Sequence, residues 1–184
     1  MGNTVTNVTA GKPKIGGAVY RAPIGTALPT TADATLNEAF LCLGYCSDAG
    51  VTNTLTINSN ATNAWGGDPV LNVQTSKTDE WGLTLIEALN TDVLKVAFGD
   101  SNVSGALSTG ITVNVNATEQ AAAEYVIDMI MTNGAKKRVV LPNAKVTAIG
   151  TITYNDSDPV GYETTLSALA DASGNTHYEY IKSA

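Results

Sequence analysis

The chain has 184 residues, of which 43% are hydrophobic and only 15% are charged. This length suits one domain, alone or with extended arms, and the hydrophobic content excludes wholesale disorder. A net charge of −7 speaks against a nucleic-acid-binding surface, which is normally basic. The charge is uneven, because residues 1–32 hold three basic residues and no acid. Either this segment docks on the acidic body of a neighbouring copy, or it is a frayed terminus with solvated lysines.

Residues 1–34 are predicted to form an extended N-terminal arm, and residues 35–184 a single β-sandwich domain. The arm is rich in glycine and proline, and Pro13, Pro23 and Pro29 oppose both a helix and a central strand. One short strand is expected at residues 18–21. No apolar run approaches the ~20 residues that cross a membrane. The start lacks a hydrophobic signal-peptide core, which predicts synthesis in the cytoplasm.

Beyond the arm, apolar and polar residues alternate at every second position, the period of half-buried β-strands. Turn signals recur about every 8–12 residues, which is typical of an antiparallel sandwich or barrel. Asn133-Gly134 predicts a tight hairpin turn with positive φ angles. The expected strands are residues 40–47, 54–58, 71–76, 81–85, 111–116, 125–131, 138–141, 146–154, 162–170 and 177–181.

One segment departs from this pattern and predicts a short helix. Asn90 is the expected N-cap, Asp92 lies in the first turn and Gly99 follows the end. The apolar stripe at helical spacing consists of Val93, Leu94, Ala97 and Phe98. A helix of about two turns is marginal alone, so this one must pack on the sheet. A weaker helical pattern covers residues 118–123.

The sequence holds no recognisable catalytic or metal-binding motif, so we predict no enzyme, no cofactor and no metal. His177 has neither a nucleophile nor an orienting carboxylate in a recognisable frame. Residues 155–158 approach a calcium loop, but Val160 stands where that loop needs glycine. Cys42 and Cys46 are too few for a zinc site and are expected to be small buried hydrophobes on one strand face.

The basic cluster at residues 136–138 follows the predicted turn. It is interpreted as a solvated hairpin tip, and pairing with acids of another subunit is the alternative. Carboxylate pairs such as Glu119 with Glu124 are expected to be solvated or interfacial, because nothing in the sequence fixes them in a cleft.

Four stretches carry a family resemblance: residues 43–51 (LGYCSDAGV), 64–70 (AWGGDPV), 79–89 (DEWGLTLIEAL) and 90–103 (NTDVLKVAFGDSNV). In this order and spacing they resemble the major tail tube protein of long-tailed phages that infect Gram-positive hosts. The likeness runs from about Gly17 to the C-terminus. Each motif is short, and the specificity lies in the four together.

The resemblance implies a mainly β fold: an antiparallel β-sandwich with one short flanking helix, an extended N-terminal arm and a long stacking hairpin loop. Such subunits form rings, usually of six, that stack into a hollow non-contractile tube in the virion. They are made in the host bacterial cytoplasm. DNA passes through the lumen without specific binding, and an acidic lumen would repel its phosphates. Implied partners are further copies of the chain, the tape measure protein, the tail terminator and distal tail proteins.

By this resemblance the arm that reaches adjacent rings maps to residues 12–30. The stacking loop maps to residues 58–68, with Trp65 at its base. The predicted inter-subunit contacts are Lys12, Lys14, Tyr20, Arg21, Asn58, Trp65 and Asp68.

Three alternatives stay open. The chain can be the inner tube of a contractile tail or tail-like particle, or another virion β-sandwich such as a decoration or tail-terminator protein. A carbohydrate-binding β-sandwich is the alternative from a different class. Its sites usually expose aromatic platforms, whereas the aromatic content here is 6%.

Overall fold

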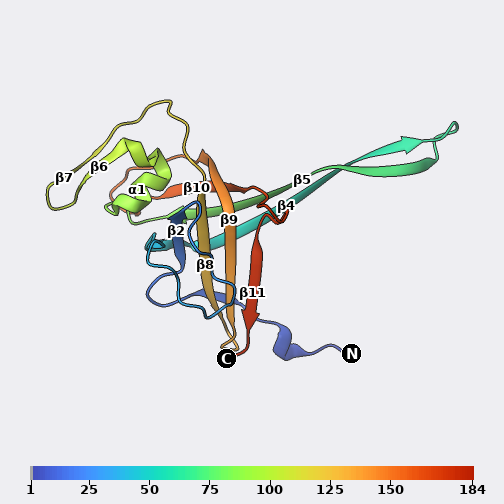
Figure 1. Cartoon of the computed structure of the whole chain (residues 1–184), viewed down its shortest axis with the longest axis horizontal. Coiled ribbons are helices and arrows are strands. Elements are labelled where there is room, and N and C mark those ends of the chain that lie inside the picture. The colour runs from blue at the N-terminus through green and yellow to red at the C-terminus, as the bar shows by residue number, and fades with distance from the viewer. Residues whose placement is uncertain (1) are drawn as a thin grey trace.

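The computed structural model describes residues 2–184 and consists mainly of antiparallel strands with one α-helix (Figure 1). This confirms the predicted fold class. The elements in chain order are η1 (Val5–Asn7), β1 (Gly11–Pro13), β2 (Val19–Pro23), β3 (Leu41–Cys42), β4 (Cys46–Asn63), β5 (Pro69–Leu85), α1 (Thr91–Phe98), η2 (Asp100–Asn102), β6 (Val103–Ala106), β7 (Gly110–Val113), β8 (Ala123–Met131), β9 (Lys136–Ile149), β10 (Tyr162–Ala168) and β11 (Tyr178–Lys182).

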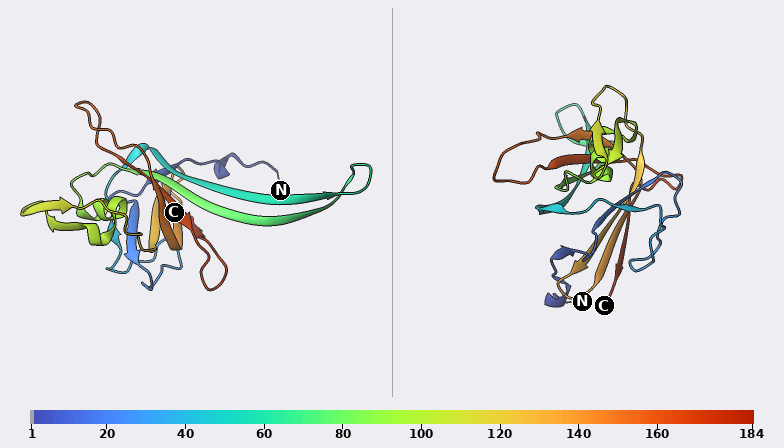
Figure 2. Two further views of the ribbon diagram at one scale, coloured as in Figure 1. Left: turned by 90° about the horizontal axis from the view of Figure 1, so that it is seen from above. Right: turned by 90° about the vertical axis from the view of Figure 1, so that its left-hand side faces the viewer.

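Nine of the strands belong to one antiparallel sheet with the order β3-β2-β8-β9-β10-β5-β4, and β1 and β11 add to β8 and β9. The long strand β9 joins the two halves of this sheet. Its residues 136–140 pair with β11, whereas its residues 144–149 pair with β10. The two halves face each other as a β-sandwich with the core between them (Figure 2). Strands β6 and β7 form a separate hairpin beside α1.

The main core lies on one face of each half-sheet, because successive side chains of a strand point to opposite faces. Trp81, Leu83 and Leu85 of β5 are buried in it, as their shared face predicted. Tyr125 and Ile127 of β8 meet them from the other half. The alternating pattern therefore located the core side of both strands.

A second apolar cluster covers the opposite face of β2, β8 and β9. It contains Ala22, Phe40, Val126 and Val140, with Leu28 and Leu36 packed against it. Residues 24–40 supply three of these side chains and so lie across this face of the sheet. Both faces of β8 are thus buried, one by the main core and the other with the help of residues 24–40.

Helix α1 confirms its predicted capping. The Asn90 side chain accepts a hydrogen bond from the backbone N–H of Asp92, and Gly99 follows the last turn with φ 95°. Val93, Leu94 and Ala97 are buried, as the stripe predicted, and Val96 joins them in the core. The helix packs beside β6, β7 and β9.

The N-terminal segment is extended, but much of it lies within the sheet of its own chain. β1 pairs with β8 through Gly11 and Met131, and β2 lies between β3 and β8. Val19 and Ala22 are buried in the two apolar clusters. The short strand expected at residues 18–21 is confirmed as β2, which extends to Pro23. A proline is tolerated at this last position and ends the strand there.

Several element boundaries required correction. Residues 118–123 are not helical, residues 40–47 do not form one continuous strand, and the two strands expected within residues 138–154 are the single strand β9. Cys42 and Cys46 therefore lie on separate strands, β3 and β4. Both thiols are free and half-buried, and burial raises the pKa of Cys46 to about 11. The Cys46 thiol is therefore not activated as a thiolate.

The expectation of a solvated hairpin tip at residues 136–138 is wrong for Arg138. Its side chain is only 2% exposed. Its guanidinium donates to both carboxylate oxygens of Asp128, at 2.6 and 2.8 Å. It also donates to the backbone oxygens of Thr31 and Ala34. Arg138 therefore ties residues 24–40 to the sheet through a buried ion pair.

Candidate assembly surface

The most distinctive surface is the β4–β5 hairpin, which extends from the body as a long two-stranded ribbon (Figures 1 and 2). β10 pairs with β5 only as far as Glu80, and from Leu55 outward the two arms pair only with each other. At about 3.4 Å per residue, residues 55–63 extend roughly 30 Å. The hairpin therefore reaches about the diameter of a small domain beyond the sandwich.

Every residue from 52 to 78 is exposed, although the ribbon carries several large apolar side chains. These are Leu55, Ile57, Val70, Leu71 and Val73, each between 48% and 63% exposed. The alternation that predicted half-buried strands is therefore present here, but no part of residues 2–184 covers its apolar side chains. Exposed apolar patches of this kind mark contact surfaces for other molecules, and an isolated two-stranded hairpin is marginally stable in water.

The three hairpin residues predicted to make contacts lie at different places on it. Trp65 lies at the tip and is fully exposed, so its predicted place at the base of a loop was wrong. Asp68 closes the tip by accepting a backbone hydrogen bond from Ala64 at 2.8 Å. Asn58 lies inside β4, where its side chain donates to the Ser76 hydroxyl at 3.0 Å. The expected loop at residues 58–68 is mostly strand.

A buried carboxylate fixes the point where the hairpin leaves the body. Asp79 is 1% exposed and accepts hydrogen bonds from Asn53 at 2.7 Å and Thr176 at 2.6 Å. His177 Nδ1 lies 2.5 Å from the same carboxylate, and its ring stands edge-on to Trp81. Burial alone would raise the pKa of Asp79, but these hydrogen bonds outweigh burial and hold the pKa below its usual value. His177, predicted as a strand residue, thus helps to hold the base of the β4–β5 hairpin against the body.

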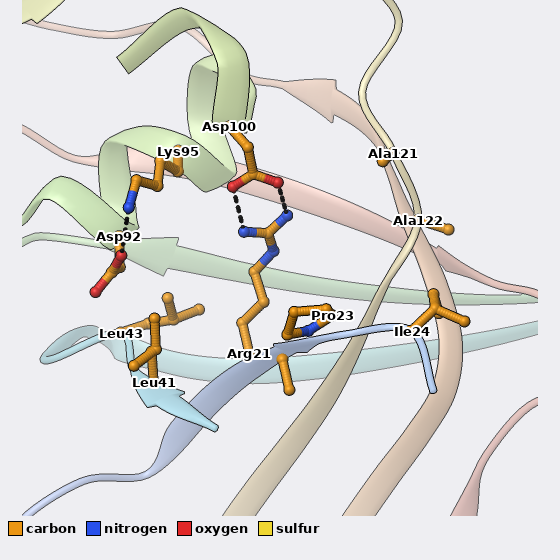
Figure 3. A pocket seen from close by; sticks show the side chains of 11 residues that line it. Arg21, Pro23, Ile24, Leu41, Leu43, Asp92, Lys95, Asp100, Ala121 and Ala122 are labelled. Atoms are coloured by element: carbon orange, nitrogen blue, oxygen red, sulfur yellow. Dashed lines mark hydrogen bonds and ion pairs between the residues drawn. The ribbon is translucent and has the colours of Figure 1, made fainter. Parts of the chain in front are cut away.

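Arg21 lies in a shallow cavity of about 260 Å³ between β2 and α1 (Figure 3). Its guanidinium donates to both carboxylate oxygens of Asp100, each at 2.7 Å. These bonds hold the pKa of Asp100 below its ordinary value. Leu41 and Leu43 line the apolar side of the cavity, and Asp92 and Lys95 pair at its edge. Because Arg21 is engaged in this pair, it joins β2 to the α1 region of the same chain.

The other arm residues predicted to contact neighbours are also near their own sheet. Lys14 lies 3.4 Å from Asp128, and the Tyr20 hydroxyl donates to the backbone oxygen of Gly17 at 3.2 Å. Lys12 is exposed on β1 opposite Ile130 and has no ion pair among residues 2–184. The proposed electrostatic docking of the arm therefore depends on Lys12 more than on Lys14 or Arg21.

The outer face of the β10-β5-β4 half-sheet is polar. Glu163 lies opposite Thr84 and Ser167 opposite Glu80, so these side chains share the face that points away from the core. Thr52 and Thr54 of β4 extend the face to the sheet edge. The surface is a layer of hydroxyl groups with two exposed carboxylates, Glu80 and Glu163.

Glu124 is a buried carboxylate that the structure only half satisfies. One oxygen accepts the backbone N–H of Gly25 at 2.8 Å, whereas the other oxygen has no protein partner among the described residues. Burial raises the pKa of Glu124. A raised folded-state pKa means that the ionised form costs stability, and this cost appears as the pH rises through the folded-state pKa.

Glu124→Gln is therefore expected to raise the thermal unfolding midpoint at about pH 7.5 and to leave it unchanged at about pH 4, below the unfolded-state pKa of ~4.3. The amide keeps an oxygen for the Gly25 N–H and removes the buried charge. Thermal denaturation across this pH range checks the result. The exposed Glu38→Gln is the control and shifts neither midpoint. An equal effect of Glu124→Gln at both pH values would contradict the assigned cause.

No cluster of side chains among residues 2–184 has the composition to hold a metal ion. The acidic turn at residues 155–158 is closed by its own hydrogen bonds, in which Asn155 accepts from the backbone of Ser157 and Asp158. The described residues also include no helix that is long and apolar enough to span a membrane.

The fold and this surface define a β-sandwich subunit from which a long, partly apolar hairpin projects. The sequence profile of the phage tail tube protein family matches residues 2–184, and the chain belongs to this family. It is accordingly a structural component of phage tails and part of the virion. No curated protein matches the chain. Among solved structures it is similar to the anti-feeding prophage cap, a tube-terminating cap seen by cryo-EM, at 10% identity and a TM-score of 0.43, with both chains covered over 100% of their length.

Proposed function

We propose that this protein is the major tail tube subunit of a long-tailed, siphovirus-type phage. Its copies form rings, six subunits each, and the rings stack into a hollow non-contractile tube through which DNA leaves the capsid. The proposal rests on the family match over residues 2–184 together with one structural observation. That observation is the β4–β5 hairpin, whose apolar side chains are exposed along the whole of its projecting length.

Ring formation is supported by the edges of the sheet. The strand order ends at β3 and β4, and no other strand among the described residues pairs with the outer edge of the 18-residue strand β4. A long free edge is prone to pair with other chains. A heterologous contact repeated about an axis closes into a ring, which leaves no strand edge exposed. Neighbouring copies that complete the β4 edge would give a continuous barrel around the axis.

The polar face of β10, β5 and β4 is the surface we assign to the lumen. It carries hydroxyl groups and the carboxylates of Glu80 and Glu163, while Lys145, the nearest basic residue on β9, is paired with Glu119. Carboxylates repel phosphate groups, so DNA passes without adhering to the wall. A basic wall would instead retain DNA by releasing its counterions. During assembly this lumen holds the tape measure protein, and the tube ends meet the tail terminator and distal tail proteins.

Negative-stain electron microscopy of the purified protein tests the proposal. We expect long hollow filaments or stacks of rings, because all contacts that build the tube lie on the subunit itself. Single rings that never stack would instead indicate a tail-terminator protein. A monomer at high concentration, with no filament formed, would overturn the proposal. Immunogold labelling of virions distinguishes tube from decoration protein by its position along the tail.

A further inference from the structure

The apolar side chains nearest the body lie on one face of the hairpin. Leu55 is opposite Asp79 and Ile57 is opposite Lys77, and directly opposed residues in an antiparallel pair share a face. The next pair toward the body on this face is Asn53 with Trp81, which is buried in the core. Leu55 and Ile57 therefore continue the core side of the sandwich beyond its own edge.

A β-bulge interrupts the hairpin on the tip side of Leu55 and Ile57. Asn58 is opposite Ser76, but the next residue, Ser59, is opposite Gln74. Thr75 is thus an extra residue on β5, and its hydroxyl donates to the backbone oxygen of Asn58 at 3.1 Å. Because the side-chain period is two, one extra residue places the β5 side chains on the tip side of the bulge on the other face.

The apolar side chains beyond the bulge accordingly lie on the opposite face. Val73 is opposite Asn60 and Leu71 is opposite Thr62. Asn60 and Thr62 have the same parity on β4 as Asn58 and the opposite parity to Ile57. The hairpin thus presents Leu55 and Ile57 on one face and Leu71 and Val73 on the other, each about half-exposed.

The distal part of the hairpin has the composition of a protein–protein contact. From residue 58 to residue 74 the only charged side chain is Asp68, which lies at the tip. Depletion of charge is the compositional mark of interface cores. A surface that is half apolar and otherwise composed of neutral Asn, Thr and Ser suits another neutral β-surface. The rest of this chain offers such surfaces, since only 15% of its residues are charged.

We propose that the bulge at Thr75 divides the hairpin into two contact surfaces that bind two different copies of this chain. The proximal surface, Leu55 and Ile57, packs on the adjacent copy in the same ring, where it extends the core side of the sandwich. The distal surface, Leu71 and Val73, packs on a copy in the next ring, which the roughly 30 Å reach of the ribbon allows. The inference rests on the proposed function.

Two copies are required because the apolar pairs face opposite directions. A single neighbouring sheet lies against one face of a ribbon and leaves the other face in water. Without the bulge Leu55, Ile57, Leu71 and Val73 would lie on one face, and one neighbour would cover them. The extra residue therefore gives the ring contact and the stacking contact separate surfaces on one element.

Deletion of Thr75 tests the inference directly. The deletion removes the extra residue and returns Leu71 and Val73 to the face of Leu55 and Ile57. We expect a subunit whose unfolding midpoint is close to that of the wild type, because within residues 2–184 the projecting strands pair only with each other. We also expect no tubes in electron micrographs. The matched control is Thr75→Ala, which keeps the bulge, loses only the hydroxyl contact to Asn58 and forms tubes.

Two double variants test the two contact surfaces independently, and they remain informative if the deletion variant does not fold. Leu55→Asp with Ile57→Asp should leave monomers, whereas Leu71→Asp with Val73→Asp should leave single rings, as measured by light scattering and microscopy. Arrest of both variants at the same stage would overturn the inference, as would normal tubes from the Thr75 deletion. Failure of the wild type to form tubes would instead refute the proposed function.

Discussion

Arg138→Met is expected to lower the free energy of unfolding by about 3–5 kcal/mol, the usual result of removing one partner of a buried ion pair. The substitution keeps most of the side-chain volume but leaves the Asp128 carboxylate buried with only Lys14, at 3.4 Å, to balance it. It also removes the two hydrogen bonds to the backbone oxygens of Thr31 and Ala34. Chemical denaturation of the purified subunit measures the loss.

The double variant Arg138→Met with Asp128→Leu is the informative control. Because it removes both charges, it should recover much of the lost stability, whereas the single Asp128→Leu should be destabilised by its unpaired arginine. Recovery in the double variant identifies the unpaired charge as the cause. If the double variant is as unstable as Arg138→Met alone, then the fastening of residues 24–40 by their backbone oxygens matters more than the ion pair.

Removal of the projecting hairpin is expected to abolish tube formation and to leave the folded body intact. Thr56 and Thr78 are opposite each other on β4 and β5, so residues 57–77 can be replaced by Asn-Gly, which forms a two-residue hairpin turn. The shortened subunit retains the Asp79 cluster and all strands of the sandwich. We expect its thermal midpoint to stay within a few degrees of the wild type.

Size-exclusion chromatography and electron microscopy at matched concentrations measure the effect on assembly. The shortened subunit should elute as a small species and show no filaments, even in high concentrations of salt that favour apolar contacts. Filaments of normal length from this variant would show that the hairpin is dispensable for stacking. A large loss of thermal stability would show that the hairpin supports the body, contrary to its lack of contacts with it.

The β8–β9 hairpin shows why the buried ion pair between Asp128 and Arg138 was not predicted. Asn133-Gly134 predicts a tight hairpin turn with positive φ angles, and a turn formed by these two residues alone would place Asp128 opposite Val139. In the structure only Gly134 has a positive φ, Met131 pairs with Ala135, and the loop has three residues. Three-residue loops with one left-handed residue are a common alternative that dipeptide patterns do not distinguish. The register moves by one residue and Asp128 faces Arg138.

The hairpin anchor could not be predicted, because Asp79 and His177 are 98 residues apart and no local pattern joins them. The same holds for Arg21 and Asp100, which are 79 residues apart. Such pairs are decided by which strands become neighbours, and neighbouring strands follow from the whole topology. A carboxylate in an otherwise apolar strand face, as at Asp79 before Trp81, was the one local signal that a buried partner was needed.

The sequence alone determined the antiparallel β architecture, the core faces of β5 and β8 and the capped helix at residues 91–98, because alternation, turns and caps are local properties of the chain. Only the tertiary structure decided that β1 and β2 belong to the sheet and that Leu55 and Ile57 stay uncovered. Alternation states which side of a strand is apolar. What covers that side depends on residues far away in the chain or in another copy of it.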